Sequence, residues 1–173
     1  LLFFGNIFSQ NSSLVSEAKT LPNIDGEVIN DEAWGGISAI KTFTQKSPDE
    51  GTPSTEQTIV KIMYSEETFY VSVVCYDSDP NKIVITDTRR DAPLNNTDSF
   101  MFVLDTYQDQ QNGFVFGTNA GGIEYDAQVS GGGEGMSISS TRQSVGIGAN
   151  FNINWDAAWE VKTKIGDFGW SAE

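Results

Sequence analysis

The chain has 173 residues, of which 38% are hydrophobic and 20% are charged, a composition typical of one globular domain rather than of a disordered segment. The formal net charge of −14 argues against nucleic acid as a partner, because phosphates need clustered lysine and arginine to displace their counterions. The sequence contains no histidine, which removes serine–histidine–aspartate and cysteine–histidine catalysis and most zinc sites.

The first nine residues, LLFFGNIFS, are typical of the end of a secretory signal peptide. Their apolar run is too short to span a bilayer and ends at the small residue Ser9. We therefore expect a signal-peptide remnant over 1–9, a polar leader over 10–20 and a folded domain over 21–173. The domain would then be exported to the periplasm, the outer membrane or the cell surface. The alternative is that the apolar start forms a buried N-terminal strand.

The next segments predict one helical turn and one hairpin. Asn30 or Asp31 can cap a single turn that carries Glu32 near its start and stops at Gly35. The stretches TIVKIMYS and TFYVSVVCYDS follow, separated by the spacing of a hairpin around 65–68. Within the second stretch, the single cysteine, Cys75, has the setting of a small buried hydrophobic residue.

The remaining segments predict further short strands separated by turns. These are a strand at 83–88, a strand at 97–106, hairpins at Asn112-Gly113 and at 120–122, a glycine-rich mobile loop from 130, and a strand–turn–strand unit over 155–173. No segment shows a sustained helical period. The pattern therefore predicts an all-β fold, an antiparallel β-sandwich.

The strand TDSFMFVLDT poses a question because both of its faces carry apolar side chains. An ordinary half-buried strand is plainly polar on one face. The second face, with Met101 and Val103, is either covered by another layer or free to bind a ligand. Shared parity along three strands predicts a single core, made of Phe69, Val71, Val73, Phe100, Phe102, Leu104, Phe114 and Phe116.

Five stretches occur in the order found in domains similar to family 9 carbohydrate-binding modules: IDGEVINDEAW, YSEETFYVSVVCYDSDP, TDSFMFVLDT, NGFVFGTNAGG and WDAAWEVKTKIGDFGWSAE. The chain most resembles the family 9-like domain at the N-terminus of large exported bacterial proteins, whose long C-terminal region is thought to be related to outer-membrane barrels. The resemblance covers 21–173. It implies a jelly-roll β-sandwich, cut here before its last strands, with a non-catalytic sugar-binding ancestry and often bound calcium.

The sequence departs from the sugar-binding members at three positions. Asn95 stands where those members have one of two tryptophans that sandwich the sugar. Met101 stands at the position of an expected acidic ligand, and Val115 lies near that of an expected arginine. The resemblance therefore implies that any sugar site here differs from the family's reducing-end mode.

The candidate ligand-binding residues are Trp155, Tyr125, Arg89, Arg90 and Asn95. Trp155 lies between two polar stretches, and its ring, like that of Tyr125, could stack on the C–H face of a pyranose. The arginines form the only paired basic element, and a guanidinium suits bidentate recognition of hydroxyls or a carboxylate. The alternative for the arginines is a salt bridge to Asp91, Asp98 or Asp105.

Three aspartates, Asp77, Asp79 and Asp105, belong to acid clusters that could hold a structural calcium ion. Calcium is the only cofactor that we expect. The alternative is that these side chains cap turns, as aspartates commonly do.

These observations predict a non-catalytic carbohydrate-binding module of a larger exported protein linked to carbohydrate catabolism. Its partners would be a glycan and the C-terminal region of the same parent chain. A second hypothesis is a structural sandwich that has lost sugar binding and docks on that C-terminal region. A third is part of a glycoside hydrolase, with hydrolase activity on O-glycosyl compounds elsewhere in the parent chain. The sequence offers no means of choosing a catalytic carboxylate pair.

Overall fold

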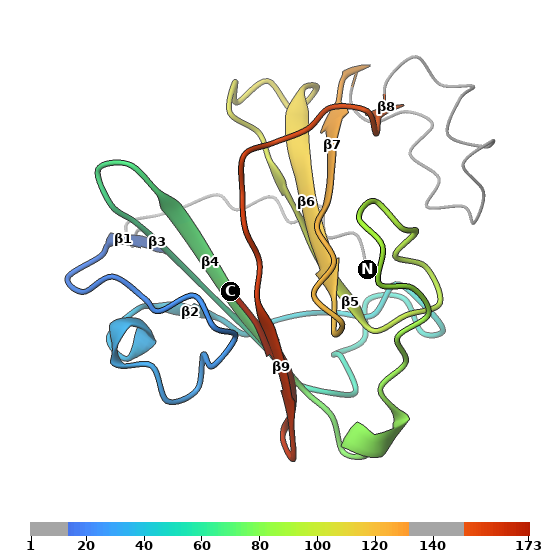
Figure 1. The fold of residues 1–173 in the computed structure, drawn as a ribbon. Coiled ribbons are helices and arrows are strands. Elements are labelled where there is room, and N and C mark those ends of the chain that lie inside the picture. Colours follow the sequence, from blue (N-terminus) through green and yellow to red (C-terminus); the bar gives the residue numbers. More distant parts are fainter. Residues whose placement is uncertain (1–13, 132–150) are drawn as a thin grey trace. The chain divides into compact units, whose positions relative to one another are not determined.

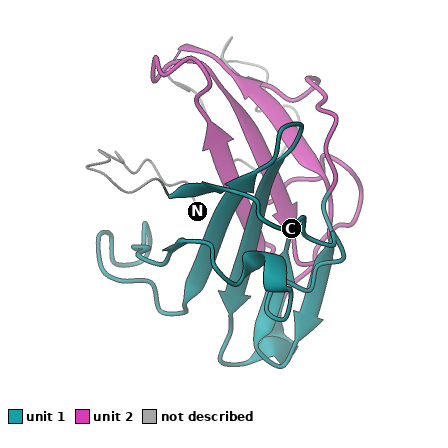
Figure 2. Ribbon diagram, turned by 90° about the vertical axis from the view of Figure 1, so that its left-hand side faces the viewer, with its two compact units in different colours: residues 1, 3–83, 161–173 teal, residues 2, 84–160 magenta. Residues whose placement is uncertain are grey.

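A computed structural model describes residues 14–131 and 151–173 (Figure 1), which form two compact units (Figure 2). Unit 1 contains the chain up to Ile83 together with Val161–Glu173, and unit 2 contains Val84–Glu160. The predicted signal-peptide remnant and all but the first two residues of the predicted glycine-rich loop lie outside the described residues. The regular secondary structure of the described chain is β-strand in two sheets, apart from the 3-10 turns Glu32–Trp34 and Pro80–Lys82, so the predicted all-β fold class is confirmed.

Unit 1 is built on a mostly antiparallel sheet with the strand order β1-β3-β4-β10-β9, in which β2 also pairs with β3. Only β1 and β3 run parallel. The predicted hairpins β3–β4 and β9–β10 are both present. The strands are β1 Val15–Glu17, β2 Ala39–Ile40, β3 Thr58–Tyr64, β4 Phe69–Tyr76, β9 Thr163–Gly166 and β10 Gly169–Ala172.

One face of this sheet packs around Trp34, which is fully buried. Asp31 caps the 3-10 turn η1 (Glu32–Trp34) by accepting a hydrogen bond from the Ala33 N–H, as predicted. The turn places the indole against Met63 and Val74, which point to the same side of β3 and β4. A short cap therefore carries the largest side chain of this apolar cluster into place.

The carboxylate of Glu173 links the end of the chain to the turn that precedes η1. It accepts hydrogen bonds from the Trp34 indole N–H at 2.8 Å and from the backbone N–H groups of Asp25 and Gly26 at 3.1 and 3.0 Å. Burial raises the pKa of Glu173, and these three donors oppose that effect. The contacts join segments almost 150 residues apart, which is how unit 1 closes from two pieces of chain.

Strand β1 lies inside the segment that we expected to be a polar leader. Its three residues pair with Ile62, Met63 and Tyr64 of β3. The folded domain therefore begins before the predicted boundary at Leu21. A strand of three residues is too short to show the alternation of apolar and polar side chains that identifies strands in a sequence. It is extended because its backbone pairs with the edge of β3.

Unit 2 contains the second sheet, with the strand order β5-β6-β7-β8 and antiparallel pairing throughout. The hairpin predicted at 120–122 is confirmed. The predicted turn at Asn112-Gly113 is wrong in detail, because Gly113 already opens β6 and the connection occupies 105–112, with positive φ at Gln108 and Gln110. The strands are β5 Ser99–Leu104, β6 Gly113–Asn119, β7 Tyr125–Val129 and β8 Phe151–Asn152.

The predicted single core is wrong. Phe69 is 44% exposed, and the deepest residue of β6 is Val115, at 0%, which has the opposite parity from Phe114 and Phe116. Val115 belongs to an apolar cluster with Ala127, and Met101 packs against it. The second face of TDSFMFVLDT is therefore covered at Met101, while Val103 nearer the strand end stays partly exposed. Alternation separated the two faces correctly. In unit 1 the predicted core residue Val73 is buried, at 2%, whereas in unit 2 side-chain size misidentified the more deeply buried face.

Two segments predicted as strands are irregular. Residues 83–88 contain no strand, and neither do 155–161. Val84 instead pairs with the next loop: its N–H donates to the Asp98 carboxylate, and its carbonyl accepts from Asp98 N and Thr97 Oγ1. Side-chain and loop hydrogen bonds thus take the place of a ladder.

Replacing Gly169 by alanine should destabilise the protein strongly. Gly169 has a φ of +125°, and a Cβ there would lie 2.1 Å from the carbonyl oxygen of Cys75. Backbone atoms cannot give way cheaply, so we expect the free energy of unfolding to fall by about 2 kcal/mol or more. Gly36→Ala is the control, because a Cβ at Gly36 meets nothing within 4 Å. Urea unfolding of both variants checks this, and equal midpoints would contradict it.

Candidate functional site

Six aromatic side chains of unit 2 gather on one face of the β5–β8 sheet, opposite the Val115 cluster. We call them the aromatic face: Phe100, Phe102, Phe114, Phe116, Trp155 and Trp159. Alternation along β5 and β6 places the four phenylalanines on this side. Trp155 and Trp159 come from residues 155–159, a segment that we call the strap.

Trp155 is held by two phenylalanines of β6. Its ring stacks on Phe114 with a centroid distance of 4.5 Å and meets Phe116 edge-on at 6.0 Å. Trp159 meets Phe116 edge-on at 5.3 Å. Both tryptophans remain half-buried. The predicted platform residue Trp155 therefore lies on a fixed aromatic bed and keeps part of its surface accessible.

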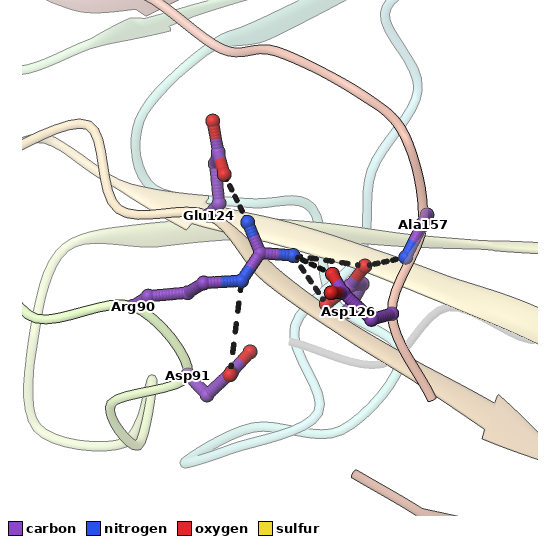
Figure 3. A network of polar contacts seen from close by, with 6 residues as sticks. Arg90, Asp91, Glu124, Asp126 and Ala157 are labelled. Carbon is purple, nitrogen blue, oxygen red and sulfur yellow. Dashed lines mark hydrogen bonds and ion pairs between the residues drawn. The ribbon is translucent and has the colours of Figure 1, made fainter. Parts of the chain in front are cut away.

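Arg90 lies at the centre of four carboxylates (Figure 3). Its guanidinium donates to Glu124 and Asp156 and to both carboxylate oxygens of Asp126 at 3.2 and 3.3 Å. Asp91 lies farther off, with 3.9 Å between its carboxylate and Nε. We call this the Arg90 network: Arg90, Asp91, Glu124, Asp126 and Asp156.

The Arg90 network and the aromatic face meet at Asp126. This residue pairs with Phe116 across β6 and β7, is 1% exposed, and accepts a hydrogen bond from the Ala157 N–H at 2.6 Å. Arg90 also holds Asp156, the residue after Trp155. Asp126 and Arg90 together therefore fix the strap, and with it both tryptophans, over the aromatic face.

Burial and neighbouring charges shift the pKa values of two members of the network, Arg90 and Asp91. Burial opposes the charge on Arg90, but the surrounding carboxylates outweigh it and raise the Arg90 pKa. Burial raises the pKa of Asp91, and Arg90 opposes that rise. Each of the four carboxylates is paired with the same guanidinium. Such an arrangement suits hydrogen-bonded recognition at its exposed members better than proton transfer.

Arg89 does not join this network. Its guanidinium makes a two-pronged contact with Asp87, at 3.0 Å from Nε and 2.6 Å from Nη2. The side-chain hydrogen bond from Arg89 holds the pKa of Asp87 well below its usual range. The salt-bridge alternative therefore describes both arginines in the structure, although Asp98 and Asp105 are not the partners found for either.

Tyr125 cannot serve as an exposed sugar platform. It is 8% exposed and belongs to the apolar cluster around Val115. Burial, with a smaller contribution from Asp91, raises the pKa of its phenol to about 12. The sequence shows only that Tyr125 lies on a strand. Tyr125 pairs with Gly117 across β6 and β7, and this register directs its ring to the face of the Val115 cluster.

The remaining candidates are Asn95 and the three aspartates proposed as calcium ligands. Asn95 is half-buried in the loop before β5. Asp77 accepts from the Asp79 N–H at 2.7 Å, and Asp79 pairs with Lys82. Asp105 accepts from the N–H groups of Asp109 and Gln110, so Asp77 and Asp105 cap turns, whereas the side chain of Asp79 makes no capping hydrogen bond. In residues 14–131 and 151–173, no three acidic, cysteine or histidine side chains gather as a metal site.

Sequence reasoning missed Asp126 and Asp156, and it missed that Trp155 packs on the rings of Phe114 and Phe116. Asp126 and Asp156 are ordinary acids among 24, and only the fold brings them to Arg90. The available signal was an aspartate inside a β-strand, where acids are depleted and need a partner when buried. The two phenylalanines were noticed, but as core residues.

No family model matches this chain, and no curated protein or solved structure matches it either. In the part of the chain that the structure describes, no helix has the length and apolar character needed to cross a bilayer.

Removing Arg90 should destabilise the protein much more than removing its neighbour Arg89. Arg90→Ala leaves the buried Asp126 without its guanidinium partner, and we expect the free energy of unfolding to fall by about 2 kcal/mol. This is less than for a fully buried ion pair, because Arg90 is partly exposed. Arg89→Ala breaks only an exposed pair and should leave the melting temperature almost unchanged. Thermal and urea unfolding provide the measurement. Equal effects of the two variants would show that the Arg90 network does not anchor unit 2.

The phenol of Tyr125 should lose its proton at a higher pH than an exposed tyrosine does. The difference in ultraviolet titration between the wild type and Tyr125→Phe should show a step near pH 12. Because an unfolded tyrosine ionises near pH 10, the unfolded chain loses that proton first, and the stability contributed by the neutral phenol falls as pH rises from about 10 to 12. A reversible step near pH 10 in the folded protein would contradict burial of this ring.

Proposed function

We propose that this domain is a non-catalytic glycan-binding module of a larger exported protein, and that Trp155 is its stacking residue. The observation that carries the proposal is the position of Trp155: half-buried, stacked on Phe114, and followed by the exposed carboxylate of Asp156. An aromatic plane next to a few fixed polar groups is the usual composition of a sugar site. The family 9-like resemblance agrees with this role.

The polar rim of the site would come from the exposed members of the Arg90 network. Asp156 is largely exposed, and Arg90 and Glu124 are partly exposed. Carboxylates accept hydrogen bonds from sugar hydroxyls, while a guanidinium donates to hydroxyl and ring oxygens. Because these groups already hold one another, little conformational entropy is lost when a ligand engages them.

The acidity of the chain selects among glycans. A net charge of −14 disfavours anionic polysaccharides, so the proposed ligands are neutral sugars. Binding through one half-buried ring and a small rim should be weak, with a Kd of about 1 mM for mono- and disaccharides.

A second function, a structural module that docks on the C-terminal region of its parent chain, is favoured by one observation. Met101 and Val115, where the resemblance implies polar sugar ligands, both pack in the apolar cluster of unit 2. A family-type site on that face would require charged side chains in a core. A domain that binds no sugar in solution but binds a separately expressed C-terminal region would support this second function.

Trp155→Ala should abolish the binding of neutral mono- and disaccharides without unfolding the domain. Isothermal titration with neutral mono- and disaccharides provides the measurement, and the expected change is from about 1 mM to no measurable heat. Tyr107→Ala is the matched control, because Tyr107 is an exposed aromatic residue of the same unit. It should bind as the wild type does. Binding that survives Trp155→Ala, above all at micromolar strength, would overturn the assignment of the site.

A further inference from the structure

A second exposed group of aromatic and acidic side chains lies in unit 1, at the tip of the β3–β4 hairpin. Tyr64 is paired with Phe69 of β4 on one side and with Glu17 of β1 on the other. Paired residues of neighbouring strands point to the same face, so the three side chains form a row across three strands. We call this group the hairpin row: Glu17, Tyr64 and Phe69.

The hairpin row is exposed at a place where the same face is otherwise apolar. Tyr64 is 45% exposed and Phe69 is 44% exposed, whereas Val60 and Val73, farther along the same face of the two strands, are buried. Ile62 and Val71, between these pairs, are half-buried. A single exposed aromatic residue needs no explanation, but two adjacent rings that continue an apolar face form a candidate for a binding surface.

The dimensions and chemistry of the hairpin row suit an extended sugar chain. Neighbouring strands lie about 4.8 Å apart, so the three side chains span roughly 10 Å, enough for successive sugar units. The two rings offer planes for C–H faces of pyranoses. Glu17 stands at one end of the row, and the exposed Glu66 and Glu67 lie in the hairpin turn, where they can accept hydrogen bonds from hydroxyls.

Charge decides which polymer the hairpin row could take. The charged side chains of the row and of the hairpin turn at 65–68 are all carboxylates, and the whole chain carries a net charge of −14. An acidic polysaccharide would be repelled, as would nucleic acid or an anionic membrane surface. A neutral glycan meets no such penalty and can use both the rings and the carboxylates.

We propose that the hairpin row is a second glycan-binding surface, specific for neutral polysaccharide chains and separate from the Trp155 site. The inference extends the proposed function, since it assumes that glycans are this domain's ligands. Two weak sites on one domain gain strength on a polymer, because binding at one raises the effective sugar concentration at the other where the polymer can reach both.

Native gels cast with a neutral polysaccharide, hydroxyethylcellulose or galactomannan, test the proposal by the retardation of the domain. The Tyr64→Ala/Phe69→Ala variant should bind about tenfold more weakly, as expected when stacking anchors are lost. Tyr64→Phe keeps both rings and should bind almost as the wild type does. Glu17→Gln, which leaves the apolar surface intact, should weaken binding about threefold. Polygalacturonate, an acidic polymer, should retard none of them.

The controls separate this proposal from the proposed function. Tyr107→Ala should behave as the wild type, and circular dichroism confirms that each variant is folded. If Trp155→Ala loses binding while the double variant and Glu17→Gln keep it, the hairpin row is not a glycan surface and the proposed function stands. If no neutral polymer retards the wild type, both fail. If the wild type self-associates on gel filtration and only the double variant is monomeric, without any glycan retardation, the row is a contact between copies and the proposal is overturned.

Discussion

The candidate site depends on one electrostatic constraint, the pairing of the Arg90 guanidinium with the buried carboxylate of Asp126. A carboxylate that is 1% exposed on a β-strand is stable only if a cation and hydrogen-bond donors compensate for its lost hydration. Arg90 and the Ala157 N–H provide that compensation. Because Ala157 lies between Trp155 and Trp159, satisfying Asp126 also positions both indoles over Phe114 and Phe116. The aromatic face is therefore a consequence of how one buried charge is neutralised.

Much of the fold could be predicted from local patterns. The cap at Asp31, the β3–β4 hairpin and the β9–β10 hairpin each have a signal contained within a few residues, and all three are present. The predictions that were wrong depend on contacts between residues that are distant in the sequence. Residues 83–88 have strand composition, yet Val84 bonds to Asp98 and Thr97 instead of joining a ladder. Alternation of side chains cannot show which face of β6 is buried more deeply. Size therefore favoured Phe114 and Phe116 as core residues over the smaller Val115, which is the fully buried one.

The site could be predicted only in part, for the same reason. Trp155 and Arg90 were both identified from local context, and the structure brings their segments together through Asp156 and Asp126. Tyr125 was placed wrongly because the register of β7 against Gly117, which turns its ring inward, is a long-range property. The calcium hypothesis, which rests on acid clusters and on the family 9-like resemblance, stays a prediction; in the structure Asp77 and Asp105 accept backbone N–H groups while Asp79 pairs with Lys82. In the described part of unit 2, the gathered carboxylates surround a guanidinium instead.

The most direct test of glycan binding at Trp155 uses the four tryptophan indole N–H signals of the ¹⁵N-labelled protein in a titration with a neutral oligosaccharide such as cellohexaose. Trp34 and Trp170 are buried in unit 1 and serve as internal references, while Trp155 and Trp159 lie on the aromatic face of unit 2. We predict that the Trp155 signal shifts progressively as ligand is added, that the Trp159 signal shifts with it, and that the signals of Trp34 and Trp170 do not move. A titration that moves chain signals elsewhere but leaves Trp155 unchanged, or that moves none, would contradict it.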